Sequence, residues 1–320
     1  MNSPLHAQAN LEYNEDFSNV ICSGKYRAEA REQFQKMKQL EESQTYTCTD
    51  YLCESHNVLN PLEPSVNEEC RVTMTEWCYQ VIDYAKLHRE SVTIAMRLLD
   101  RFLSCNTHDA KEVLASRNLY QLATMSALFI AIKTNERTIV TTTEFAQLSR
   151  GRFEASDVVR MESVILTDLE WRISAPTTHS FLRYIVAMLP TDLQHTIASS
   201  QVFTELCNFQ LDLSAGDYSF VTEKPSVTAV AALLNAYANA KNSDAFNMTS
   251  SFDYSSFSTE LTRVTGIETH SVVVQEALLR LVTLVKNNGV QFLLPSQIVM
   301  MERLSPKFTR DLSPVCVALI

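Results

Sequence analysis

Two stretches of the chain decide its fold: LATMSALFIAI, residues 122–132, and VTAVAALLNAYANA, residues 227–240. Almost every side chain in them is apolar or small, so a helix formed by either stretch has no polar face to turn towards water. Both are too short to cross a bilayer, which needs about 20 apolar residues. Each helix must therefore be surrounded by other helices, and the chain is expected to hold two helical units, one around each stretch.

The segments around residues 122–132 carry the apolar spacing of amphipathic helices, which is clearest in residues 74–85. Ser65 and Glu68 have the spacing of a capping box, which predicts that this helix begins just after them. The expected helices of the first unit contain residues 74–85, 91–103, 122–132, 144–149 and 156–169. The first unit is thus a shell of four helices around one buried helix.

The sequence Ala175-Pro176-Thr177 interrupts the helical pattern, because proline cannot continue a helix. A second set of helices follows, and Pro225 suits the first turn of its apolar central helix. Its expected members are residues 181–189, 197–213, 227–240, 255–264 and 269–286. The fold class is therefore all-α, with two tandem five-helix units.

The ends of the chain have a different character. Residues 26–44 predict an additional helix before the first unit, with an apolar stripe formed by Tyr26, Ala30, Phe34, Met37 and Leu40. Two prolines make residues 55–66 a connector, and the tail has little periodicity. The expected division is an N-terminal segment, residues 1–66, a first unit, 67–174, a second unit, 175–287, and a tail, 288–320.

Composition excludes several functional classes. The net charge of −10 disfavours nucleic-acid binding and docking on anionic membranes, and the absence of a long apolar run excludes a membrane span. The 8 cysteines are scattered without a zinc-ligand pattern, and Cys48, Cys53 and His56 lack a second ligand pair, so no metal is expected. Because phosphate loops and nucleophile motifs are also missing, we expect neither an enzyme nor a cofactor.

Three segments carry a family resemblance. They are ECRVTMTEWCYQVIDYAKLHRESVTIAMRLLDRFLS, residues 69–104, LYQLATMSALFIAIKTNE, residues 119–136, and VVRMESVILTDLEWRISAPTTHSFL, residues 158–182. Together they resemble the cyclin family, in its cell-cycle type with an N-terminal and a C-terminal cyclin box. The resemblance implies two tandem cyclin-fold domains and a regulatory subunit of the nucleus and cytoplasm. Such a subunit binds and activates a cyclin-dependent serine/threonine kinase, and its other partners are kinase substrates or inhibitors.

The resemblance also implies roles for individual residues. The family holds the kinase with a lysine and a glutamate, which match Lys133 and Glu162. Apolar contacts would come from Ile130, Leu166 and Trp171, with Thr134 beside them. Without the resemblance, the two charges are read as solvated helix positions, and Trp171 is equally compatible with the core. Many cyclins have Lys-Phe-Glu-Glu where this chain has Lys133-Thr-Asn-Glu, which leaves the choice of kinase open.

Two further sets of residues match the family pattern. Arg71 and Asp100 correspond to a buried ion pair that fixes the first box, although two solvated charges are the alternative. A substrate-docking patch on the first helix would consist of Met74, Trp77, Gln80, Tyr120 and Gln121, although an ordinary helix surface is equally compatible with them.

Two other functions stay open. One is a cyclin-fold scaffold that activates no kinase, which the Thr134-Asn135 departure favours. The other is a nucleic-acid binder similar to general transcription factor IIB, which would need a basic stripe.

Overall fold

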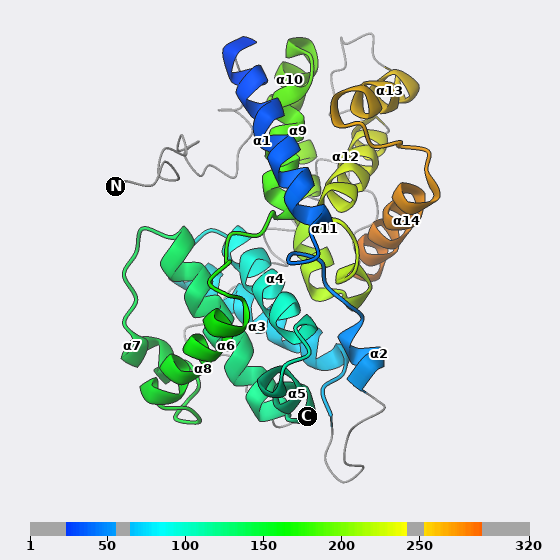
Figure 1. Cartoon of the computed structure of the whole chain (residues 1–320). Coiled ribbons are helices and arrows are strands. Elements are labelled where there is room, and N and C mark those ends of the chain that lie inside the picture. Colours follow the sequence, from blue (N-terminus) through cyan, green and yellow to red (C-terminus); the bar gives the residue numbers. More distant parts are fainter. Residues whose placement is uncertain (1–23, 56–64, 242–252, 290–320) are drawn as a thin grey trace, which may run out of the picture.

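The computed structural model describes residues 24–55, 65–241 and 253–289, and every regular element in them is a helix (Figure 1). The tail after 289 and most of the connector between 55 and 66 lie outside the described residues. Within those residues, no helix is both long and apolar enough to cross a membrane. The prediction of an all-α chain with two tandem units is confirmed.

The first unit is built around α6, Arg117–Asn135, which is buried on every side from Tyr120 to Ile132. The helices around it are α3, Glu68–Ala85, α4, Glu90–Ser104, α5, His108–Ala115, α7, Thr142–Gln147, and α8, Ala155–Asp168. A uniformly apolar helix is stable only when protein surrounds it, and α3, α4, α5 and α8 all pack against α6.

The second unit repeats this plan around α12, Pro225–Lys241. Its other helices are α9, Thr178–Met188, α10, Thr191–Ala198, α11, Gln201–Gly216, α13, Tyr254–Thr265, and α14, Val272–Asn287, with a short 3-10 turn at Tyr218–Phe220. The helices α9, α11 and α14 pack directly on α12. The two units lie one above the other in Figure 1, and each has its own hydrophobic core.

Some local expectations were wrong. The cap of α3 is Asn67, whose side chain accepts a hydrogen bond from the backbone of Cys70, so the helix begins after Asn67 and not after Ser65. The helix expected over 197–213 is two helices, because Ser200 caps the start of α11. The short helix α5 was not expected either, and α2, Tyr51–Ser55, is a single turn that also escaped the pattern.

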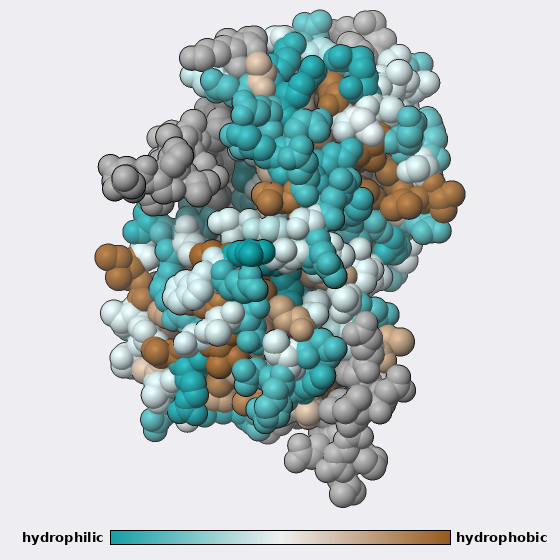
Figure 2. All heavy atoms as spheres, viewed as in Figure 1, coloured by the Kyte–Doolittle hydropathy of each residue, from teal (hydrophilic) through white to brown (hydrophobic). Residues whose placement is uncertain are grey.

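The N-terminal helix α1, Gly24–Glu42, belongs spatially to the second unit and lies along α9 (Figure 1). Phe34 is buried edge-on against Phe181, with ring centroids 5.5 Å apart. The outer face of α1 is hydrophilic, as the teal spheres over it in Figure 2 show. The predicted stripe is too long, because Tyr26 and Leu40 at its ends are exposed.

Polar side chains join the two units. Glu90 at the start of α4 is buried and accepts hydrogen bonds from Arg183 Nη1 at 2.5 Å and from the hydroxyl of Thr177 at 2.7 Å. Arg89 donates from Nε to Asp212 of α11 at 2.7 Å. The first turn of α4 thus fixes the second unit against the first.

Candidate functional site

Lys133 and Glu162 form an ion pair at the surface of the first unit. Lys133 lies in the last turn of α6 and Glu162 in the middle of α8, and these two helices pack side by side. The Lys133 side chain is 40% exposed and that of Glu162 13% exposed. Lys133 Nζ also lies 4.5 Å from the centre of the Phe129 ring, one helical turn earlier. Both charges are therefore positioned by the fold and still reachable from outside.

Two of the residues expected to flank this pair are buried. Ile130 and Leu166 belong to the first hydrophobic core, because α6 is enclosed on all sides and Leu166 lies next to the inward-facing Ile165. The sequence predicts an apolar anchor from these two residues, and in the structure both side chains lie inside the core of the first unit. Thr134 is exposed, and its hydroxyl bonds back to the carbonyl of Ile130 at 2.9 Å.

Trp171 is an exposed aromatic residue just after the end of α8, with 70% of its surface accessible. Glu170 and Trp171 both have left-handed backbone torsions, with φ of 50° and 60°. Such torsions cost non-glycine residues about 1–2 kcal/mol each. The Trp171 amide compensates in part by donating to the carbonyl of Leu166 at 2.8 Å. The chain therefore turns sharply after α8 and leaves the indole outside the core.

Sequence reasoning missed two exposed apolar side chains, one in the loop after α6 and one on α8. Ile139, in the loop between α6 and α7, is 92% exposed. Val159 is half exposed on α8, three residues before Glu162, so the two side chains share a helix face. The available signal was the Ile139-Val140 pair within an otherwise polar loop.

Glu136 holds the loop that follows Lys133, a role that the sequence did not reveal. One of its carboxylate oxygens accepts from the amide of His88 at 3.0 Å and from the Ser91 hydroxyl at 2.6 Å. The other lies 2.9 Å from His88 Nδ1. Asn135 adds a bond to Ser91 at 3.0 Å. The end of α6 is thereby tied to the turn between α3 and α4.

The proposed substrate-docking patch is not a surface in this structure. Its members Met74, Trp77, Tyr120 and Gln121 are buried, and Gln80 alone is partly exposed. The physical reason is the helical periodicity of α3, because the same spacing that predicts its inward stripe already includes Met74 and Trp77.

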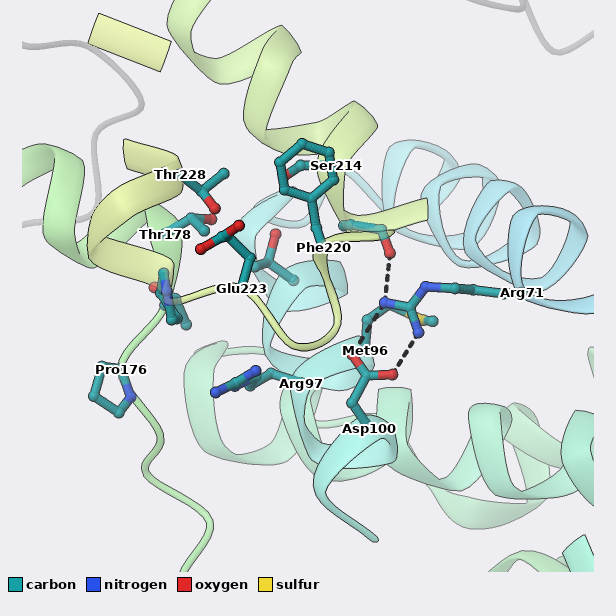
Figure 3. Close-up of a pocket in the computed structure, with 14 residues that line it drawn as sticks. Arg71, Met96, Arg97, Asp100, Pro176, Thr178, Ser214, Phe220, Glu223 and Thr228 are labelled. Atoms are coloured by element: carbon teal, nitrogen blue, oxygen red, sulfur yellow. Dashed lines mark hydrogen bonds and ion pairs between the residues drawn. The ribbon is translucent and has the colours of Figure 1, made fainter. Parts of the chain in front are cut away.

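Arg71 and Asp100 lie against each other, and both are buried (Figure 3). Arg71 Nη2 donates to Asp100 Oδ2 at 3.0 Å and to the carbonyl of Ala215 in α11 at 2.8 Å. The Tyr51 hydroxyl donates to Asp100 Oδ1 at 3.0 Å. The pair thus connects α2, α3, α4 and α11, beside a small pocket between the units that includes Phe220 and Thr178.

This architecture, two stacked helical units each enclosing one apolar helix, defines the cyclin-type fold. Residues 32–174 match the family model of the cyclin N-terminal domain, and residues 176–291 match that of the cyclin C-terminal domain. The chain therefore belongs to the cyclin family, whose members are regulatory proteins without catalysis of their own.

Several known proteins are similar. Cyclin-A3-3 of Arabidopsis thaliana is 28% identical over 181 residues, which are 57% of this chain and 52% of that protein. G2/mitotic-specific cyclin-B2 of Oryzias javanicus is 26% identical over 244 residues, 72% of this chain and 58% of that protein. The chain thus spans about half the length of the curated relatives it matches.

The X-ray structure of a viral cyclin from herpesvirus saimiri superposes with a TM-score of 0.51. The two chains are 15% identical, and the match covers 74% of this chain and 95% of the viral one. This likeness shows the fold.

Proposed function

We propose that this chain binds and activates a cyclin-dependent serine/threonine kinase, through Lys133, Glu162 and Trp171. The observation that carries the proposal is the surface ion pair of Lys133 and Glu162 in the cyclin fold. A lysine ammonium has three donors and a carboxylate can accept several hydrogen bonds. After pairing with each other, both side chains can still bind a partner. The exposed indole of Trp171 adds the kind of aromatic contact that often dominates binding energy.

Activation would follow from differential binding. A protein kinase is active when its regulatory helix places a glutamate against the catalytic lysine. This chain would bind that helix in its active position. Shifting the equilibrium from about 1% to about 99% active requires roughly 5.5 kcal/mol of binding preference. An interface of ordinary size is large enough to supply it.

The direct test exchanges the two charges in one variant, Lys133→Glu with Glu162→Lys. The exchange keeps an attractive pair inside this chain but reverses the polarity presented to the kinase. We expect the affinity for a cyclin-dependent kinase to fall at least about 30-fold, the loss of one interface hot spot of about 2 kcal/mol. A kinase-binding assay measures the affinity, and histone phosphorylation measures the activation of the kinase.

A matched control exists in the second unit. Glu260 and Arg263 form a pair on α13 with exposed fractions of 14% and 59%, close to those of Glu162 and Lys133. Exchanging Glu260 and Arg263 should leave kinase binding unchanged. Undiminished binding by the Lys133–Glu162 exchange would contradict the proposal.

Trp171→Ala should lower the affinity for the kinase while leaving the stability of the fold nearly unchanged. Because the side chain is exposed, we expect the free energy of unfolding to change by no more than about 0.5 kcal/mol. Kinase affinity should nevertheless fall at least about tenfold, since aromatic residues are enriched among binding hot spots. Calorimetric titration and urea unfolding of the same variant separate the two effects, and a loss of stability with full affinity would assign Trp171 to the fold.

The same proposal places the protein in cell-cycle control, in the nucleus and cytoplasm, with kinase substrates or inhibitors as further partners.

A cyclin-fold scaffold without kinase activation is the second candidate. Thr134 favours it, because this exposed threonine stands where many cyclins carry an aromatic residue. Binding without stimulation of the kinase would select the scaffold.

A further inference from the structure

Three arginines gather around residues 45 and 46. The segment 43–50 leads from α1, on the second unit, to α2, on the first (Figure 1). Arg97 and Arg101 reach it from α4, and Arg172 reaches it from the chain that follows α8. We call Arg97, Arg101 and Arg172 the arginine cluster.

The cluster is bonded mostly to neutral groups. Arg97 Nη2 donates to the carbonyl of Tyr46 at 2.7 Å, and Arg101 donates to the carbonyls of Thr45 at 3.4 Å and of Arg172 at 2.6 Å. Among the described residues, the one carboxylate paired with the cluster is that of the exposed Glu170, 2.9 Å from Arg172 Nη2. Positive charge is therefore concentrated here without a matching number of acids.

Arg101 has an unused donor. The residue is 2% exposed, and its Nη2 is buried without a hydrogen-bond partner. Burial, together with the nearby charge of Arg97, lowers the pKa of Arg101. Because a guanidinium is planar, one N–H of Nη2 is parallel to the N–H of Nε, which donates to Thr45. The unused donor therefore faces the side on which Thr45 lies.

Thr45 itself is exposed, and its hydroxyl oxygen accepts a hydrogen bond from Arg172 Nη1 at 3.2 Å. We propose that Thr45 is a phosphorylation site, and that Arg172 and Arg101 bind its phosphate. A protein kinase would transfer the terminal phosphoryl group of a nucleoside triphosphate to the Thr45 oxygen. The phosphoanhydride bond breaks, the hydroxyl proton passes through the kinase to solvent, and the nucleoside diphosphate leaves. The proposal does not depend on the kinase partner proposed above.

The neighbouring threonine shows why the position is specific. Thr47 is also exposed, but its hydroxyl donates to the carbonyl of Ser43 at 3.1 Å. The hydroxyl that would carry a phosphate at position 47 contacts a main-chain carbonyl. The hydroxyl that would carry one at position 45 contacts the guanidinium of Arg172. Thr47 is therefore the matched control for Thr45.

Phosphorylation would add a charge of about −1.5 to −2 and allow one to three charge-assisted hydrogen bonds. Arg101 Nη1 already holds the carbonyl of Arg172, directly after Trp171. A phosphate bound by Arg101 and Arg172 would therefore tie three segments together: the one between α1 and α2, helix α4, and the turn that presents Trp171.

The experiment uses the full chain in three forms: unmodified, with phosphothreonine installed at position 45, and with phosphothreonine installed at position 47. We expect phosphate at position 45 to raise the thermal midpoint by about 2–4 °C, and phosphate at position 47 to leave it unchanged. Arg172→Gln should abolish the rise, and this arginine is exposed enough for the variant to fold. In parallel, mass spectrometry of the chain purified from dividing cells should find phosphate on Thr45.

Each contrary result overturns the proposal. The first is a rise of the thermal midpoint that persists in Arg172→Gln. The second is an equal rise with phosphate at position 47, and the third is the absence of phosphate on Thr45 in the chain purified from cells. Inorganic phosphate added to the unmodified chain tests the source of the ligand. If it raises the midpoint while Thr45 is never modified in cells, the arginine cluster binds a phosphate from another molecule and Thr45 is not the acceptor.

Discussion

Replacing Arg71 with methionine should lower the free energy of unfolding by about 3–5 kcal/mol, because it leaves the carboxylate of Asp100 buried without its cation. The same change removes the hydrogen bond to the carbonyl of Ala215, which joins α3 to the end of α11. The loss should therefore affect both the first unit and its contact with the second. Urea unfolding followed by far-ultraviolet circular dichroism measures it.

The control is the ion pair of Glu32 and Lys36 on α1, in which both side chains are more than half exposed. Lys36→Met should change stability by no more than about 0.5 kcal/mol. The double variant Arg71→Met with Asp100→Leu should recover part of the loss, since no buried charge then remains. If Arg71→Met costs no more than Lys36→Met, the buried pair contributes nothing to the fold.

At low pH, protonation of Glu90 should weaken the contact between the two units. Burial disfavours the charged form of this carboxylate, but Arg183, His179 and the Thr177 hydroxyl outweigh it and lower the pKa of Glu90 to about 2. Its pKa in the unfolded chain is close to 4.5. The folded pKa is thus depressed, so the stabilisation is complete above about pH 4.5 and is lost as the pH falls towards 2. Its size is about 3 kcal/mol.

Glu90→Gln should therefore remove most of this stability at pH 7 and flatten the acid limb of the stability curve between pH 4.5 and 2. Measuring the free energy of unfolding at several pH values tests the expectation. Glu29→Gln, at an exposed position on α1, should leave the curve as in the original chain. Parallel acid limbs for the original chain and Glu90→Gln would show that other carboxylates control the transition.

Much of the fold could be predicted because burial leaves a periodic trace in the sequence. Val158, Met161 and Ile165 of α8 and the capping residue Leu169 are buried, as the spacing predicts. The short helices α2 and α5 left no such trace, because a helix of one or two turns contains too few repeats to show a period. The available signals were two capping residues: Thr107 before α5, and Ser200 at the boundary between α10 and α11.

The candidate site was less predictable. A uniformly apolar helix has no period, so the position of Ile130 within α6 says nothing about whether it reaches the surface. Family resemblance placed Met74 and Trp77 on a docking surface, whereas periodicity placed them inside, and periodicity was correct. Contacts such as those between Arg172 and Thr45 join residues far apart in the chain and depend on how the units are stacked, which no local pattern encodes.

The packing of α1 on the second unit has a consequence for biosynthesis. This helix leaves the ribosome early, but Phe181, which covers Phe34, is synthesised after the whole first unit. At about 5–20 residues per second, the delay lasts on the order of 7–30 seconds. During that interval the apolar side of α1 lacks the surface of α9 that covers it in the folded chain, until the second unit emerges and packs against it.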